Sequence, residues 1–295
     1  MDYSNCTLCP RRCGADRVAG ELGWCGAPDR ALVAKTMLHQ WEEPVLSPNG
    51  RSSAIFFGGC TLGCVYCQNR AISRQAVGTP MDIRQLRAVM EELIAQGAEN
   101  IDLVTPTQYL PTILPALEPK LPVPVVYNCG GYESVETLKR LDGLVDVYLP
   151  DLKYFDTDLA ARYSDAPDYF PTALSALREM LRQAGKPQLD GDGIIRRGVI
   201  VRHLVLPSHR TESIALLGRL ATEFGTNAFL LSLMSQYTPD FAQNTPYPAL
   251  HRRVTSFEYN SVLSHAQALG FDGYFQSRTA ATSDFTPDFH DTGLL

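Results

Sequence analysis

The stretch of this 295-residue chain that decides its fold and chemistry is Gly58-Gly59-Cys60-Thr61-Leu62-Gly63-Cys64-Val65-Tyr66-Cys67-Gln68-Asn69, directly after the apolar run 54–57. The spacing allows one tight loop to turn Cys60, Cys64 and Cys67 toward a common centre. Cysteine thiolates are the usual ligands of a 4Fe–4S cluster, whose cubane has four iron corners. Three ligands leave one iron open for a small molecule, whereas a structural cluster or zinc site is normally closed by a fourth ligand.

The alternative for these cysteines is a set of buried thiols, since free cysteine is among the most buried residue types. Gly58, Gly59 and Gly63 beside and among them favour a ligand loop over a packed core. The C-x3-C-x2-C spacing, with the aromatic Tyr66 before the last cysteine, resembles the signature of radical S-adenosylmethionine (SAM) enzymes. In that family the open iron holds the amino and carboxylate groups of SAM. The resemblance therefore implies a 4Fe–4S cluster and SAM as cofactors.

The composition of the chain favours a globular metalloprotein. Its net charge is -6 and it has no Lys/Arg block, so nothing favours nucleic acid or an anionic membrane as a partner. No apolar run approaches the roughly 18 residues of a transmembrane helix. The N-terminal sequence lacks the basic and apolar regions of a secretory signal, so we expect a cytoplasmic protein. Seven of its eight cysteines lie in the first 67 residues, which favours metal or redox chemistry over disulfides.

Apolar runs and helical patterns alternate along most of the chain. Between the apolar runs lie amphipathic patterns, such as the one that follows Asp82 and stops at Gly97. Six β–α units predict a parallel sheet with helices outside it, and are too few for a closed eightfold barrel. We therefore predict an α/β fold: a partial (β/α)6 TIM-like barrel over 51–295 that includes a C-terminal tail, with a small Cys-rich N-terminal extension over 1–50. The strand candidates are 53–57, 101–104, 123–127, 144–149, 198–205 and 228–234.

Polar side chains at the C-terminal ends of these strands are the candidate cofactor contacts, because functional residues of such barrels gather there. A lysine at a strand mouth can hold a carboxylate, and a nearby aspartate can position it. An unpaired arginine inside an apolar strand would be costly, so it should face the polar barrel mouth. For the threonines, the alternative is an ordinary turn after the second strand. For Asp151 and Lys153, the alternative is a surface ion pair after the fourth strand. The candidates, strand by strand, are Thr105 and Thr107, Asn128, Asp151 and Lys153, Arg202, and Gln236.

From about residue 50 to 276 the chain resembles homologues of the pyruvate formate-lyase-activating enzyme. The stretches that carry this resemblance are Cys67-Gln68-Asn69, Val104-Thr105-Pro106-Thr107, Tyr148-Leu149-Pro150-Asp151-Leu152-Lys153-Tyr154 and Arg202-His203-Leu204-Val205-Leu206-Pro207.

This resemblance implies that Lys153 and Arg202 contact SAM, while Asp151 and Asn128 hold a monovalent cation. Tyr66 and Gln236 complete the set of expected cofactor contacts. The chain departs from the activating enzymes at Asn128, where they carry aspartate. It also lacks their Gly-Gly-Glu-Pro segment at Thr105–Thr107.

A second metal site is expected in the N-terminal extension. Cys6, Cys9, Cys13 and Cys25 form a complete set of four soft ligands. Their uneven spacing favours an auxiliary iron–sulfur cluster, and the turn-like Cys9–Cys13 segment favours zinc. Four unliganded thiols are the third alternative. A bound metal would give this segment a fold that its own core could not build.

The resemblance implies a radical SAM oxidoreductase, fed by an external one-electron donor of flavodoxin or ferredoxin type. Reductive cleavage of SAM would yield a 5′-deoxyadenosyl radical that abstracts hydrogen from a substrate. One hypothesis is that the chain activates a glycyl-radical protein as its protein substrate, and a second that it modifies a small molecule or peptide. The alternative from another class is a non-catalytic iron–sulfur or zinc-binding protein.

Overall fold

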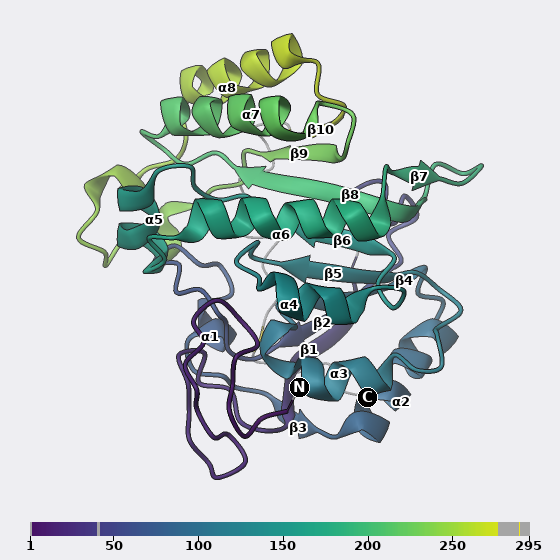
Figure 1. The fold of residues 1–295 in the computed structure, drawn as a ribbon. Coiled ribbons are helices and arrows are strands. Elements are labelled where there is room, and N and C mark those ends of the chain that lie inside the picture. The colour runs from purple at the N-terminus through teal and green to yellow at the C-terminus, as the bar shows by residue number, and fades with distance from the viewer. Residues whose placement is uncertain (1, 40–41, 277–288, 290–295) are drawn as a thin grey trace.

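Ten strands form one open sheet in the computed structural model, which describes residues 2–39, 42–276 and 289 (Figure 1). The strand order is β10-β9-β8-β6-β5-β4-β2-β1-β3, and β7 pairs with β8. The strands are β1 (Ala31–His39), β2 (Ser52–Phe57), β3 (Thr79–Met81), β4 (Asn100–Val104), β5 (Val125–Cys129), β6 (Val147–Pro150), β7 (Gln188–Leu189), β8 (Ile195–Leu204), β9 (Leu230–Met234) and β10 (Gly273–Phe275).

The central strands are parallel, as the alternating apolar runs and helical patterns predict. Each of β2, β4, β5, β6, β8 and β9 is parallel to the next along the sheet, and β10 continues this run beside β9. Only β1 with its two neighbours, and β7 with β8, pair antiparallel among the described residues. Because β10 and β3 end the sheet without meeting, the predicted partial barrel is confirmed as an open one.

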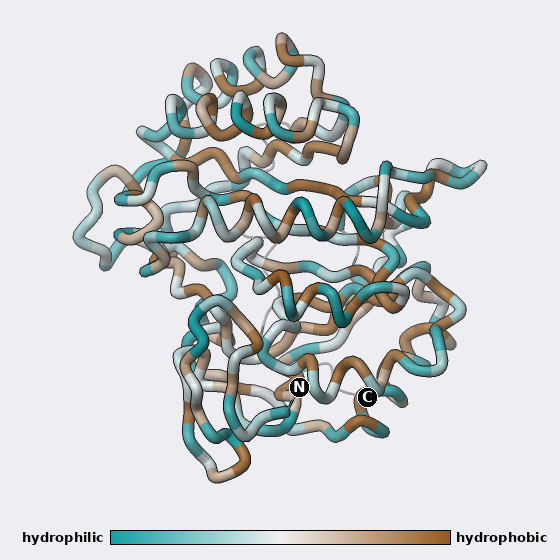
Figure 2. Tube along the Cα trace, viewed as in Figure 1, coloured by the Kyte–Doolittle hydropathy of each residue, from teal (hydrophilic) through white to brown (hydrophobic). Residues whose placement is uncertain are grey.

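Helices cover the outer face of the sheet, with their apolar sides inward (Figures 1 and 2). Two of them begin with a capping box, in which Asp82 and Thr255 bond the third residue of α2 and α8. None of the described helices is both long and apolar enough to cross a bilayer. The helices are α1 (Arg70–Ser73), α2 (Ile83–Ala95), α3 (Leu110–Ala116), α4 (Val135–Leu138), α5 (Thr157–Ser164), α6 (Tyr169–Ala184), α7 (Arg210–Phe224) and α8 (Ser256–Leu269).

The inner face of the barrel changes from apolar to polar along the strands. An apolar layer is formed by alternate strand residues with Val45 and Leu46 against them, and it includes Val126, Leu149 and Ile200. Two residues further along stand Asn128 on β5, Asp151 directly after β6, and Arg202 on β8. Because side chains two residues apart share a face of a strand, this polar layer faces the same interior, nearer the C-terminal ends.

Several elements differ from the sequence-based expectation. Residues 31–39 lie within the expected extension, yet they join the main sheet as β1. The short strands β3 and β10 and the helix α5 were not predicted, because two or three residues carry no readable period and α5 has few apolar positions. The expected C-terminal tail beyond Gln276 lies outside the described residues except for Phe289, whose ring packs against Phe56.

Candidate cluster and cofactor site

The cysteine loop follows β2 directly and closes onto α1. Gly58 N donates to Leu32 O at 2.9 Å and Gly59 N donates to Ile72 O at 2.9 Å, so both ends of the loop are fixed. A Cβ atom on Gly58 would lie 2.2 Å from Val77 O, which only glycine avoids. The loop is therefore held at the C-terminal end of β2, where a parallel barrel presents its functional groups.

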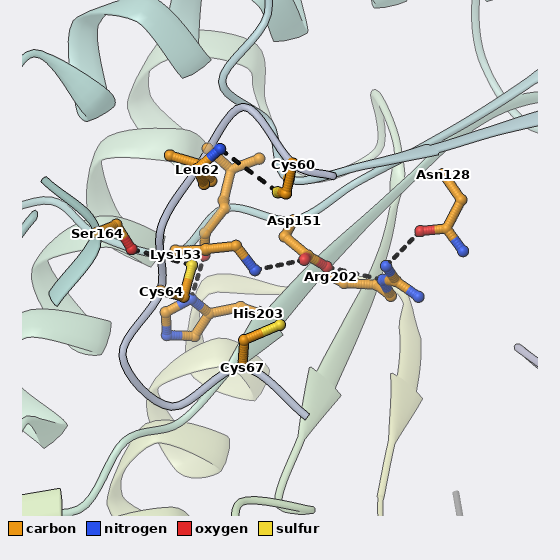
Figure 3. Close-up of polar contacts among 12 residues, drawn as sticks. Cys60, Leu62, Cys64, Cys67, Asn128, Asp151, Lys153, Ser164, Arg202 and His203 are labelled. Atoms are coloured by element: carbon orange, nitrogen blue, oxygen red, sulfur yellow. Dashed lines mark hydrogen bonds and ion pairs between the residues drawn. The ribbon is translucent and has the colours of Figure 1, made fainter. Parts of the chain in front are cut away.

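Each of the three thiols in the loop accepts one hydrogen bond. Leu62 N lies 3.4 Å from Cys60 Sγ, and Ser164 Oγ lies 3.0 Å from Cys64 Sγ (Figure 3). Ser73 Oγ lies 3.5 Å from Cys67 Sγ. Burial raises the pKa of Cys60 and of Cys67, with the neighbouring Cys64 charge adding to the effect. Bound iron would reverse this, because a coordinating thiol is deprotonated.

The donor set of this loop is one that an iron–sulfur cluster takes. Among the described residues no three Cys, His, Asp or Glu side chains converge on one metal-ion position. A four-iron cluster places each thiolate on a different iron atom, so its ligands need not converge in this way. Three soft donors on one preformed loop, each with a hydrogen-bond donor at its sulfur, meet that requirement.

Beside the loop, four side chains from three neighbouring strand ends form a row (Figure 3). Lys153 Nζ lies 2.5 Å from Asp151 Oδ2, Arg202 Nε lies 2.8 Å from Asp151 Oδ1, and an Arg202 terminal nitrogen lies 2.5 Å from Asn128 Oδ1. Burial opposes ionisation of Asp151, but the charges of Arg202 and Lys153 prevail and lower its pKa. The row therefore presents two cations that share one carboxylate.

This row also bears on the expected cation site. The resemblance assigns a monovalent cation to Asp151 and Asn128, and the structure places the Arg202 guanidinium against the side-chain oxygens of both. Another Arg202 nitrogen lies 3.6 Å from Glu42 Oε1. In the structure, these oxygens therefore have a cationic partner, the Arg202 guanidinium.

Further carboxyl groups lie behind the row, and the sequence analysis did not identify them. Asp102 is fully buried on β4 and its Oδ2 accepts from Asn128 Nδ2 at 3.1 Å. Burial, with Glu42 beside it, raises the pKa of Asp102 well above its usual range. Burial also raises the pKa of Glu43 to about 7, although Arg202 opposes the shift. The sequence did contain a signal for Asp102, because it is a charged residue within the apolar strand 101–104, as Arg202 is within its own strand.

In the segment after β4, the backbone of Thr105 is linked to the cysteine loop, whereas the hydroxyl of Thr107 is bonded elsewhere. Thr105 has a φ of +58°, and its amide donates to Asn128 O at 2.8 Å. Gln108 Nε2 lies 2.9 Å from Thr105 O and 3.0 Å from Gly58 O, so one side chain joins this turn to the cysteine loop. Thr107 Oγ1 instead faces buried Glu133, 3.0 Å from both carboxylate oxygens.

Two further expected contacts have protein partners. Tyr66 OH lies 2.7 Å from Tyr154 OH, inside a group of buried aromatic rings. Burial raises the pKa of both tyrosines, so both keep their protons. Gln236 Oε1, beyond the end of β9, accepts from Gln276 Nε2 at 2.9 Å.

Tyr169 is a positioning residue that sequence reasoning missed. From the start of α6 its hydroxyl accepts from Lys153 N at 3.0 Å and lies 2.8 Å from both Gly130 O and Asp151 O. A Cβ atom on Gly131 would lie 2.1 Å from Asp151 O, so the turn after β5 needs glycine to approach the row. A tyrosine on an amphipathic helix is normally interpreted as a core residue. Only the fold shows that the hydroxyl of Tyr169 contacts the backbone of Asp151 and Lys153.

The four N-terminal cysteines lie in a segment without helices or strands between residues 2 and 30. Cys6 and Cys9 are buried, Cys25 is partly buried and Cys13 is exposed. Burial raises the pKa of Cys9 to about 12, and the charges of Cys25, Glu133 and Cys6 add to the effect. A Cβ atom on Gly59 would lie 2.6 Å from Cys25 O, so this segment touches the residue before Cys60.

Two arginines attach the N-terminal segment to the barrel. Buried Arg17 donates to Gln108 O at 2.6 Å and its guanidinium lies 4.3 Å from the centre of the Tyr3 ring. Arg11 Nε donates to Thr61 O at 3.1 Å, and one of its terminal nitrogens donates to Ser164 O at 3.1 Å. The segment is therefore fixed against the cysteine loop itself.

Comparison with known proteins gives one similar sequence and several similar folds. No family model matches the chain. An uncharacterised protein of Methanocaldococcus jannaschii is 29% identical over 280 residues, which cover 92% of this chain and 76% of that protein.

A radical SAM methyltransferase from Sphaerobacter thermophilus matches 76% of this chain and 66% of its own, with a TM-score of 0.52 and 13% identity. Streptococcus suis SuiB bound to its precursor peptide SuiA matches 74% of this chain and 46% of its own, with a TM-score of 0.51 and 12% identity. A spore photoproduct lyase variant matches 75% and 74%, with a TM-score of 0.50 and 11% identity. The chain spans about half of SuiB and just under two thirds of the methyltransferase. It has the partial-barrel fold of radical SAM enzymes.

Proposed function

We propose that this protein is a radical SAM enzyme. The observation that carries the proposal is the loop of Cys60, Cys64 and Cys67 at the mouth of a partial barrel, with every thiol already hydrogen-bonded. These cysteines would hold a 4Fe–4S cluster, which with SAM and an electron supplies a 5′-deoxyadenosyl radical able to abstract hydrogen. An external donor of flavodoxin or ferredoxin type would provide the electron.

In this proposal the row beside the loop binds SAM. The SAM carboxylate would meet Lys153 and Arg202, since Asp151 leaves a net positive charge on the three groups. Asp151 would orient both cations, and Tyr169 would fix the backbone of Lys153. The turned backbone of Thr105 would supply a carbonyl or amide to the cofactor, as Tyr66 and Gln236 would supply packing and polar contacts around it. The buried site would exclude water from a reactive radical.

The N-terminal cysteines would hold a second metal centre, either an auxiliary iron–sulfur cluster or zinc. Support comes from four thiols in one segment and from the effect of Cys25 and Cys6 on Cys9. Contact between Cys25 and Gly59 would bring such a centre close to the cluster loop. An iron–sulfur centre there would relay electrons, and zinc would only stabilise the segment.

Two substrate classes have specific support. The Asp151-Leu152-Lys153 stretch favours a glycyl-radical protein, through the resemblance to activating enzymes. SuiB, which shares the fold, is bound to a precursor peptide in its structure, and this favours a peptide. Both substrates would present a chain segment to the open barrel.

The proposal is tested with anaerobically reconstituted, reduced protein and SAM. We expect 5′-deoxyadenosine to form, and its absence from cluster-loaded protein would exclude radical SAM chemistry. A glycyl doublet in the electron paramagnetic resonance (EPR) spectrum, after addition of candidate glycyl-radical partners from the same genome, would identify an activating enzyme. Failure with all of them, together with a mass change in a candidate peptide, would identify a peptide-modifying enzyme.

A further inference from the structure

Ser164 occupies a distinctive place at the C-terminus of α5. It is fully buried, and its hydroxyl lies between the cysteine loop and a pair of tyrosines. Ser164 Oγ is 3.0 Å from Cys64 Sγ and 2.7 Å from Tyr154 OH, which in turn is 2.7 Å from Tyr66 OH. Four side chains thus form one buried chain of hydrogen bonds that starts and ends in the same loop.

The direction of this chain follows from the proton that each group carries. A metal-bound Cys64 thiolate has no proton, so it can only accept. Ser164 then donates its single hydroxyl proton to the sulfur. It must therefore accept a hydrogen bond from Tyr154, which in turn must accept one from Tyr66. Hydrogen bonds aligned in one direction polarise one another, so the tyrosines strengthen the bond at the sulfur.

The backbone around Ser164 is fixed to the same loop. Val65 N donates to Tyr163 O at 2.9 Å, one residue before Ser164. Arg11 bridges the carbonyls of Ser164 and Thr61, each at 3.1 Å. These backbone contacts therefore hold the Ser164 hydroxyl at a fixed distance from Cys64. It is not a freely rotating hydroxyl at the surface.

We propose that Ser164 is a positioning residue that orients Cys64 and sets the reduction potential of the cluster. The inference rests on the proposed function, because it needs a cluster at this loop. Reduction adds negative charge to the cluster, and a donor at a ligand sulfur stabilises that charge. Hydrogen bonds to the sulfurs are among the features that set iron–sulfur potentials. Without the Ser164 hydroxyl, the cluster should be harder to reduce.

The test is an EPR-monitored redox titration of the full-length reconstituted protein. The signal is assigned by its loss in Cys64→Ala. We expect Ser164→Ala to lower the equilibrium constant for reduction about tenfold, or about 59 mV for a one-electron couple. Tyr154→Phe should shift the potential in the same direction by a smaller amount, since it removes the donor to Ser164 and the acceptor for Tyr66 but leaves the Ser164 hydroxyl at the sulfur. Ser175→Ala is the matched control, because the hydroxyl of this exposed helical serine bonds only Pro171 O among the described residues.

Iron and sulfide content separates the outcomes. An absent cluster in the unaltered protein would refute the proposed function itself. A full cluster in Ser164→Ala with an unchanged potential would refute only the role of Ser164. Should Ser164→Ala fail to load iron, Tyr154→Phe decides: an unchanged potential there overturns the inference, and a lowered potential supports it.

Discussion

The two cysteine-bearing regions of this molecule differ in what holds them in place. The loop of Cys60, Cys64 and Cys67 follows a central strand of a parallel sheet, and each thiol has a donor at 3.0–3.5 Å. The segment with Cys6, Cys9, Cys13 and Cys25 has no regular structure, and Arg17 approaches Cys6 Sγ only at 3.9 Å. The first site is organised by the sheet, whereas the second is held by loop contacts, to which the proposed metal centre would add order.

Cysteine substitutions should separate the two regions most strongly. Cys9→Ser should eliminate the proposed N-terminal metal and open residues 2–30 to proteolysis, because that metal would add to their order. Cys64→Ser should remove the loop cluster while the circular dichroism of the barrel stays unchanged. Iron, sulfide and zinc analysis of both variants measures the loss of each metal centre. Loss of both centres in either variant would show that the regions are not independent.

A pH titration should sharpen the comparison through Glu133, a buried barrel residue whose charge acts on Cys9. Burial raises its pKa to about 8 in the folded protein. The folded state therefore keeps a proton that the unfolded state has released, and stability falls as pH rises from about 4.5 to about 8. The total loss should be about 5 kcal/mol. Denaturant unfolding of Glu133→Gln should show a flatter profile, while the exposed control Glu136→Gln should keep the slope. Equal slopes in wild type and Glu133→Gln would contradict this.

Arg17 should be the main attachment of the N-terminal segment. Its removal in Arg17→Ala leaves the carbonyls of Gln108 and Pro28 without their donor and the Tyr3 ring without its cation. We expect a loss of about 3 kcal/mol in the free energy of unfolding of this segment, measured by hydrogen exchange. Unchanged protection of residues 2–30 would show that other contacts fix them.

Arg12 should matter least, although it neighbours Cys13 and forms an ion pair. Its partner Glu136 is 73% exposed and Arg12 itself 59% exposed. Exposed pairs of this kind contribute little. Arg12→Ala should leave both hydrogen exchange and metal content within error, and a clear loss would mean that surface charge helps to hold the segment.

The sequence predicted the barrel because its strands are long apolar runs, and the same runs made Arg202 conspicuous. It also predicted which residues follow the strands, but not which of these side chains contact one another. Ser164 ends α5, a helix that the sequence analysis did not predict, and Tyr169 lies on the amphipathic α6. Their contacts with Cys64 and Lys153 therefore appear only after both helices are packed against the loop. Arg202 against Asn128 could not be foreseen, since side-chain pairing across strands depends on register.

The central claim is that the barrel loop alone is the reaction centre. It is tested most directly by 5′-deoxyadenosine formation in three reduced, SAM-supplied proteins: wild type, Cys64→Ala, and the double variant Cys6→Ala/Cys9→Ala. We expect the product from wild type and from the N-terminal double variant under a chemical reductant, and none from Cys64→Ala. Product from Cys64→Ala, or none from a wild type with its cluster loaded, would contradict the account.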